Sequence, residues 1–175
     1  MRKYIHIFFL FPLLFLSCAS AHHLHTDTHA RFIKNVPFYP QKLYHCGPAS
    51  LAGVLNYWGL FVTQEDVANS IYSASAKGTL TIDMLAYVEE KGLKVKQFKG
   101  SVQDILNHIQ SGYPLIVLVD YGLWVYQKNH FMVIVGYNKN GVYVNSGKKH
   151  LMFMSFKKLD SIWEKTNFWT MLITP

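Results

Sequence analysis

The fold is decided by the stretch Cys46-Gly47-Pro48-Ala49-Ser50-Leu51-Ala52-Gly53-Val54-Leu55-Asn56-Tyr57-Trp58-Gly59, whose pattern predicts a helix. Pro48 suits the first turn of a helix, and Gly59 suits its end. Four apolar residues recur at the spacing of one helix face and predict that this face is buried: Leu51, Val54, Leu55 and Trp58. The stretch therefore predicts a packed helix that carries a thiol, that of Cys46, at its N-terminus.

The patterns that follow this helix change from helical to extended. Thr63-Gln64-Glu65-Asp66 resembles a capping box that starts a second helix. Thr81 is expected to cap a third helix that Gly92 ends, and a fourth helix runs from Ser101 to Gly112. Apolar runs predict strands at residues 93–98, 114–119, 131–137, 142–145, 151–154 and 168–173. Helices first and strands second predict one α+β domain, with N-terminal helices packed on a C-terminal antiparallel sheet.

Residues 1–18 have the pattern of a signal peptide. Two basic residues precede an apolar run over residues 4–16, which is shorter than the roughly 20 residues that a membrane-spanning helix needs. Phe15-Leu16-Ser17-Cys18 resembles a bacterial lipobox, although its first residue is aromatic where the motif usually has an aliphatic one. Cys18 is then lipidated and begins the mature chain, and the alternative is cleavage after Ala21. Either leader predicts export to the cell envelope of a bacterium, lipid-anchored to the membrane or periplasmic.

Residues 19–33 are a predicted flexible tether that contains histidines, and residues 34–175 are the predicted folded domain. The tether histidines are interpreted as solvated, because a flexible segment has no preformed ligand geometry. Divalent-metal binding by these histidines is the alternative.

Composition and charge exclude several classes of protein. With 50% hydrophobic and 15% charged residues, the chain is not disordered, and two cysteines cannot make a disulfide framework. The formal charge of +7 falls to +5 once Arg2 and Lys3 leave with the leader. The remaining lysines are dispersed, which argues against a nucleic-acid partner. No metal and no cofactor are expected.

The residues that suit chemistry point to a cysteine nucleophile. A helix N-terminus stabilises a thiolate at Cys46, although an inert buried cysteine is equally compatible with the pattern. His130 opens the apolar strand 131–137 at the end of a loop, where it is either a proton shuttle or a structural histidine. Antiparallel pairing brings Asn145 towards His130, unless Asn145 is only a turn residue. Gln41 is a candidate oxyanion donor beside the backbone N–H of Cys46, or else a surface residue.

Two segments resemble a known family, the C39-like cysteine peptidases, which are papain-like enzymes that include the double-glycine peptidases. Residues 36–51, from Val36-Pro37-Phe38-Tyr39-Pro40-Gln41 to Cys46-Gly47-Pro48-Ala49-Ser50-Leu51, resemble the nucleophile segment of that family. Residues 129–137, Asn129-His130-Phe131-Met132-Val133-Ile134-Val135-Gly136-Tyr137, are similar to its histidine strand. The resemblance covers most of residues 36–175 and is greatest to the standalone secreted or lipoprotein members.

The resemblance implies a papain-like fold and a role for each site residue. Cys46 is then the nucleophile, His130 the general base and later the acid, and Gln41 the oxyanion-hole donor. The third position in the family is typically Asp or Asn, often followed by Pro. Asn145 is the best match, but no proline follows it, so the neighbouring Ser146 stays a second candidate.

Three functions fit these residues. The first is a cysteine peptidase that hydrolyses peptide bonds through a thioester, with a peptide or protein as substrate and the membrane as a partner through the lipid anchor. The second is an acyltransferase of the same clan, because phytochelatin synthases share a similar Cys-Gly-x-Ala-Ser-Leu segment. The third is a non-catalytic C39-like domain that binds peptide. Three aromatic residues before the histidine either line a substrate groove or pack within their loop: Tyr121, Trp124 and Tyr126.

Overall fold

The computed structural model describes residues 30–175, so the predicted signal peptide, Cys18 and most of the tether lie outside the described residues. The helices are α1 (Cys46–Tyr57), α2 (Gln64–Ile71), α3 (Thr81–Glu90), α4 (Val102–Gln110) and α5 (Phe156–Trp163). The strands are β1 (Arg31–Phe32), β2 (Tyr72–Ser73), β3 (Gly78–Thr79), β4 (Lys94–Lys99), β5 (Leu115–Asp120), β6 (Asn129–Asn138), β7 (Gly141–Ser146), β8 (Lys149–Ser155) and β9 (Trp169–Thr174). The α+β class is confirmed. Within this part of the chain, no helix has both the length and the apolar character needed to cross a membrane.

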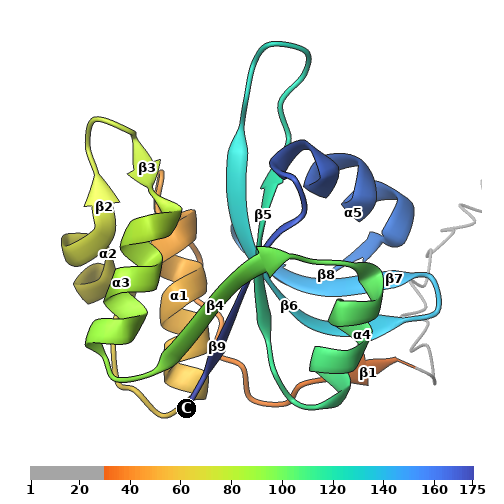
Figure 1. The fold of residues 1–175 in the computed structure, drawn as a ribbon, viewed down its shortest axis with the longest axis horizontal. Coiled ribbons are helices and arrows are strands. Elements are labelled where there is room, and N and C mark those ends of the chain that lie inside the picture. Colours follow the sequence, from red (N-terminus) through yellow and green to blue (C-terminus); the bar gives the residue numbers. More distant parts are fainter. Residues whose placement is uncertain (1–29) are drawn as a thin grey trace, which may run out of the picture.

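The strands form one large antiparallel sheet and one small hairpin. The order in the large sheet is β4-β9-β5-β6-β7-β8, and β1 pairs with β6 outside this path. β4 and β8 are therefore the two edges. The hairpin of β2 and β3 projects beside the helices α1–α3, whereas the loop between β5 and β6 projects beside α5 (Figure 1).

Helix α1 is the centre of the domain rather than a helix with one buried face. All residues from Gly47 to Leu55 are buried, because α1 contacts α2, β3, β6 and β7 on different sides. Gly53 permits one of these approaches, since a Cβ there would lie 2.8 Å from the carbonyl oxygen of Pro37. Gly59 has a φ of 87° and follows the end of the helix as predicted.

Local capping signals predicted two of three helix starts correctly. Thr63 and Asp66 form the expected capping box at α2, and Ser101 caps α4 by accepting a hydrogen bond from the backbone N–H of Asp104. The prediction that Thr81 caps α3 is wrong. Leu80 is the capping residue there and makes no side-chain cap, so Thr81 is already helical.

Several elements depart from the predicted organisation. Arg31 and Phe32 pair with β6, and Ile33 belongs to the core, so the end of the predicted tether is part of the sheet. Helix α5 follows β8 and contacts β5, β7 and β8, which places a helix after most of the strands. Strand β1 also precedes α1, β2 and β3 lie between α2 and α3, and β4 precedes α4. The order of helices first and strands second therefore holds only for α1–α4 relative to the strands β5–β8.

Candidate active site

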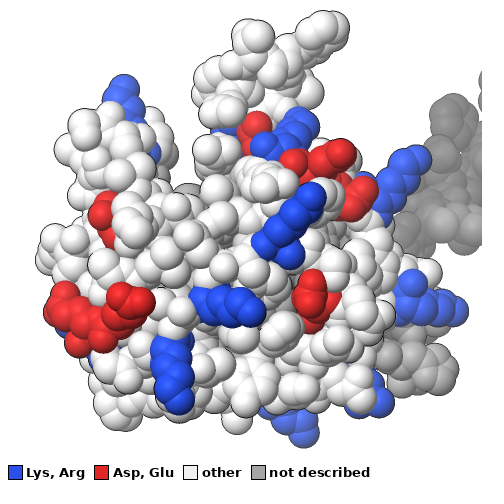
Figure 2. Space-filling view, viewed as in Figure 1, with Lys and Arg blue, Asp and Glu red and all other residues white. Residues whose placement is uncertain are grey.

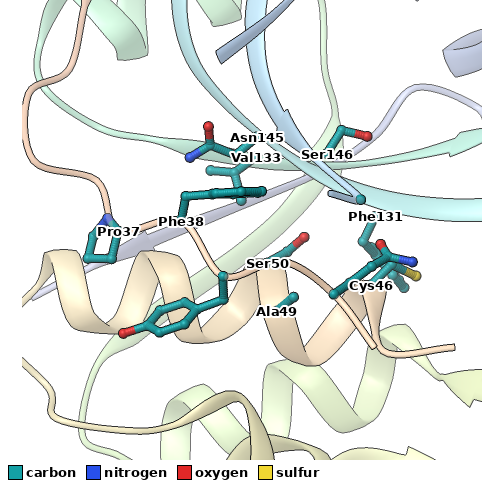
Figure 3. Close-up of a pocket in the computed structure, with 12 residues that line it drawn as sticks. Pro37, Phe38, Cys46, Ala49, Ser50, Phe131, Val133, Asn145 and Ser146 are labelled. Atoms are coloured by element: carbon teal, nitrogen blue, oxygen red, sulfur yellow. The ribbon is translucent and has the colours of Figure 1, made fainter. Parts of the chain in front are cut away.

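Cys46 is the first residue of α1 and lines a small cavity (Figure 3). The other residues that line this cavity include Gln41, Phe131, Asn145 and Ser146. Its volume of about 10 Å³ is close to the smallest space that holds one water molecule. A space of this size beside a thiol fits a single carbonyl oxygen.

The surroundings of Cys46 favour the neutral thiol at rest. Burial raises the pKa of the thiol, while the backbone N–H groups of Phe131 and Gly47 and its own N–H lower the pKa. The burial effect is the largest, because a thiolate loses its hydration in the protein interior. The N–H groups are still in place to hold negative charge when it forms.

Gln41 is fixed beside this cavity by its backbone. Its N–H donates to the carbonyl oxygen of Gly147 across 3.0 Å, which ties the segment before α1 to the end of β7. The Oε1 atom of Gln41 is buried and has no hydrogen-bond partner among the described residues. A buried polar group without a protein partner is typical of a site that a ligand completes.

His130 is the second residue of β6 and is held at one ring nitrogen. Its Nε2 lies 2.8 Å from Oγ of Ser146, and its ring lies 5.7 Å from that of Tyr121, between centroids. Burial, aided by the positive charge of Lys128, lowers the pKa of His130 to about 4. The imidazole is therefore neutral at physiological pH.

The two candidates for the third position, Asn145 and Ser146, have different hydrogen-bond partners in this structure. Ser146 is 8% exposed and contacts His130, whereas the amide oxygen of Asn145 accepts a hydrogen bond from the backbone N–H of Leu151 at 3.2 Å. Asn145 pairs with Val133 across the sheet, and neighbouring residues of a strand point to opposite faces. In this structure the hydrogen-bond partner of His130 is thus the second candidate, Ser146, and not the preferred Asn145, although Asn145 still lines the cavity.

Cys46 lies next to the backbone of the residue that follows His130. The thiol of Cys46 interacts with the N–H of Phe131, the residue after His130. The described residues give no hydrogen bond between Cys46 and His130 themselves. Contacts of this kind are often loose in unliganded enzymes and tighten around the substrate. The Nδ1 atom of His130 makes no hydrogen bond in the described part of the chain.

The loop that leads to His130 is held by hydrogen bonds at its base and is exposed to solvent at its tip. Oδ1 of Asp120 accepts hydrogen bonds from the backbone N–H groups of Gly122 and Lys128, each at 2.7 Å. Burial alone would raise the pKa of Asp120, but these two hydrogen bonds outweigh it and the pKa is lowered. Trp124 and Tyr126, two of the predicted groove aromatics, are exposed at the projecting tip, which carries no charged side chain in Figure 2.

Sequence patterns did not predict that Thr79 packs against the start of α1. The space beside Gly47 is filled by Thr79 of β3, since a Cβ on Gly47 would lie 2.8 Å from the Cβ of Thr79. The Oγ1 atom of Thr79 is buried without a partner in the described residues. The short hairpin that carries Thr79 has no apolar alternation, which is why the pattern did not predict it.

The other described histidines have structural contacts. His150 stacks on Phe38, and Nδ1 of His108 hydrogen-bonds the carbonyl oxygen of Asp104 at 2.7 Å. His45 packs on the ring of Tyr72. Across residues 30–175, no group of three or more His, Cys, Asp or Glu side chains is placed to hold a metal ion.

A cysteine at a helix N-terminus, next to a buried histidine on an antiparallel sheet, is an arrangement typical of papain-like cysteine peptidases. The sequence model of the Peptidase_C39 like family matches residues 33–170, and the chain belongs to this family. A comparison with curated proteins gave no match.

Solved structures with the same fold are also C39-like. A protein of Bacillus anthracis described as a C39-like peptidase has a TM-score of 0.70 at 17% identity, with 83% of this chain and 98% of that chain covered. The peptidase domain of ComA, a Streptococcus ABC transporter involved in quorum sensing, has a TM-score of 0.67 at 20% identity, covering 80% and 98%. A double glycine motif protease from an AMS/PCAT transporter, solved with its leader peptide, has a TM-score of 0.66 at 23% identity, covering 83% and 94%.

Proposed function

We propose that the chain is a cysteine peptidase that cleaves peptide bonds with Cys46 as nucleophile and His130 as proton shuttle. The observation that carries the proposal is the position of Cys46 at the start of α1, in one cavity with Gln41 and against the backbone that follows His130. The family to which the chain belongs supports the class of reaction. The neighbour solved with a leader peptide supports a peptide as substrate.

The first half of the reaction forms a thioester. Nδ1 of His130 accepts the thiol proton while Sγ of Cys46 attacks the carbonyl carbon of the scissile bond. The negative charge that develops on the carbonyl oxygen is held by the backbone N–H of Cys46 and the side-chain amide of Gln41. The imidazolium then gives its proton to the leaving amine, and the thioester remains.

The second half releases the acid. The neutral imidazole of His130 takes a proton from water, and the resulting hydroxide attacks the thioester. The thiolate of Cys46 leaves and takes up the proton from His130. Because Cys46 and His130 both favour their neutral forms, the cycle begins and ends with a thiol and a neutral imidazole and not with a thiolate–imidazolium pair.

Ser146 orients the ring of His130 for this cycle through the contact between Nε2 and Oγ. The cycle uses the tautomer in which Nε2–H donates to Oγ of Ser146 and Nδ1 carries no proton, so that Nδ1 accepts one. A hydroxyl provides this orientation but no negative charge. The imidazolium intermediate is therefore less stabilised than it would be beside a carboxylate.

The test is Cys46-dependent cleavage of a peptide library, with new termini detected by mass spectrometry. The full chain should generate new termini, and the Cys46→Ala and His130→Gln variants should not. A Lys42→Ala variant, which removes an exposed side chain near Gln41, serves as the unaffected control. The proposal fails if termini appear equally with Cys46→Ala. Addition of glycinamide separates hydrolysis from acyl transfer, since a transferase would cap the new C-termini with glycinamide.

We further propose that the protein is exported and anchored through a lipid on Cys18. The support is the lipobox-like pattern of residues 15–18 after an apolar run, which is typical of lipoprotein leaders. In cells fed with a clickable palmitate, the full chain should be labelled and a Cys18→Ala variant should not. Labelling that persists in Cys18→Ala would refute the anchor.

A further inference from the structure

A groove of about 740 Å³ lies next to the candidate active site, on the side of the edge strand β8. It is lined by residues of β7, β8 and α5 together with Tyr121, which lies at the base of the projecting loop. Its volume is within the range of about 300–1,000 Å³ that is usual for ligand sites. The proposed reaction assigns nothing to this groove.

The rim of the groove is positively charged. Lys148, Lys149 and Lys158 line it, and no Asp or Glu is among its lining residues. These three lysines make no ion pair and no side-chain hydrogen bond with the described residues. By contrast, Lys42 pairs with Glu65. Unpaired cations around one hollow attract an anionic ligand.

The floor of the groove is apolar. Tyr121, Met152 and Met154 line it, and the ring of Phe153 is 46% exposed there. Exposed aromatic surface inside a hollow is a common feature of binding sites. The ligand that fits this combination has both acidic and apolar groups.

The groove adjoins the small cavity at Cys46. Ser146 and Gly147 line the small cavity at Cys46 and also line the groove. A peptide chain that leaves the carbonyl held at Cys46 and passes over Ser146 therefore enters the groove. This continuity favours a segment of the substrate over a separate anionic ligand such as a lipid headgroup.

We propose that the groove binds an acidic segment of the peptide substrate that also carries apolar side chains, on one side of the bond that Cys46 attacks. The proposal rests on the peptidase function proposed above and adds the class of substrate. In this proposal, Lys148, Lys149 and Lys158 contact the acidic groups of the segment, and Tyr121 and Phe153 contact its apolar side chains.

Binding is measured with the Cys46→Ala form of the full chain, so that no cleavage occurs. The probe is a fluorescein-labelled octapeptide of alternating Asp and Leu, and the comparison peptide has Asn in place of Asp. Fluorescence anisotropy should show weaker binding of the Asn peptide. Replacing the three groove lysines together by Gln should weaken binding of the Asp peptide by roughly threefold to a hundredfold, because each exposed ion pair contributes modestly.

The matched control changes the same charge at the opposite edge of the sheet. Lys94, Lys96 and Lys99 of β4 are also exposed, and their joint replacement by Gln should leave binding within about twofold, since net charge alone acts weakly at physiological salt. Equal weakening by the two triple variants would overturn the proposal in favour of non-specific attraction. An equal affinity for the Asp and Asn peptides would also overturn it.

A second measurement connects the groove to the thiol. In the chain with Cys46 intact, saturating Asp peptide should slow alkylation of Cys46 by iodoacetamide at pH 9 at least several-fold, and the groove-lysine variant should lose this protection. Binding without protection would show a site unrelated to the substrate path. If phosphatidylglycerol vesicles bind the protein through the groove lysines and the Asp peptide does not bind, the groove is assigned to lipid. Either result refutes the acidic-substrate proposal without touching the test by Cys46-dependent cleavage.

Discussion

Replacing Ser146 by Asp is the sharpest test of how the site works. Nε2 of His130 lies 2.8 Å from Oγ of Ser146, so an aspartate at this position puts a carboxylate next to the imidazole. In the protein as it is, burial and the charge of Lys128 hold the pKa of His130 at about 4. The Ser146→Asp change adds one negative charge to that environment, which favours the positively charged form of His130.

The size of the effect follows from the distance. Two opposite charges about 4 Å apart attract by about 4 kcal/mol at an effective dielectric constant near 20, which equals roughly three pKa units. Part of this attraction offsets the burial of the new carboxylate, so the net shift is about 1–3 units. We expect the pKa of His130 in Ser146→Asp to lie between about 5 and 7.

The measurement is a pH titration of the His130 ring by NMR, assigned by comparison with a His130→Gln variant. The acid limb of kcat/KM should move with it, from near pH 4 to the new pKa, because this limb reports the catalytic base of the free enzyme. At neutral pH, Ser146→Asp should also make Cys46 more reactive towards iodoacetamide, since the carboxylate stabilises the imidazolium that accompanies the thiolate.

Ser146→Asn is the control, because it supplies a hydrogen-bond acceptor of similar size to Asp without charge. Its His130 should titrate within about half a unit of the original protein. If His130 titrates at the same pH in Ser146→Asp and in the original protein while both remain folded, the contact between residues 130 and 146 does not control the site. An ordinary histidine pKa in the original protein would refute the reasoning from burial.

Four further outcomes are expected. Gln41→Ala should lower kcat by about 10²–10³ with little change in KM, as loss of one oxyanion donor does, and an unchanged kcat would remove Gln41 from the mechanism. Asp120→Ala should lower the free energy of unfolding by about 1–3 kcal/mol in urea titrations, because it leaves the buried N–H of Gly122 and the partly buried N–H of Lys128 without their acceptor, whereas Asp120→Asn should lower it less. Trp163→Ala, at a side chain that is 1% exposed, should cost about 3–5 kcal/mol in the same assay. The pKa of His130 is lower in the folded chain than the unfolded value of 6.5, so its contribution to stability is present above pH 6.5 and is lost as pH falls towards 4. Unfolding measured between those pH values should show a fall of at most about 3 kcal/mol that His130→Gln abolishes.

The parts of the fold that the sequence predicted are those with strong local signals. The capping box at Thr63 and the glycine after α1 act within one turn of their helix, so their effect does not depend on the rest of the chain. Helix α5 was missed although Ser155 caps it, because its apolar residues directly follow an extended run and merge with it. Strand β1 has two residues, and only its partner β6 makes it a strand.

In the candidate site, too, the residues with local sequence signals were predicted and those that depend on distant pairing were not. Cys46 and His130 each mark the start of a regular element, and such starts are visible in a pattern. The choice between Asn145 and Ser146 depends on which face of β7 each occupies, and the pairing of β7 with β8 changes register between Val144 and Ser146. A change of one residue in register reverses the faces, so the sequence left both open. The lysine groove joins three segments and has no local signal at all.

A neutral resting pair also suits a single thiol outside the cytoplasm, should the proposed export be correct. Thiolates oxidise far more readily than thiols, and burial raises the pKa of Cys46 so that the thiol form prevails. A carboxylate at residue 146 would stabilise the imidazolium and with it the reactive thiolate at all times. A serine there orients His130 without doing so, and charge then develops only when a substrate carbonyl is present to receive it. A serine at residue 146, in place of a carboxylate, thus slows the chemical step but protects the thiol of Cys46 from oxidation between turnovers. If so, peroxide should inactivate Ser146→Asp faster than the original protein, and comparing the two inactivation rates tests this directly.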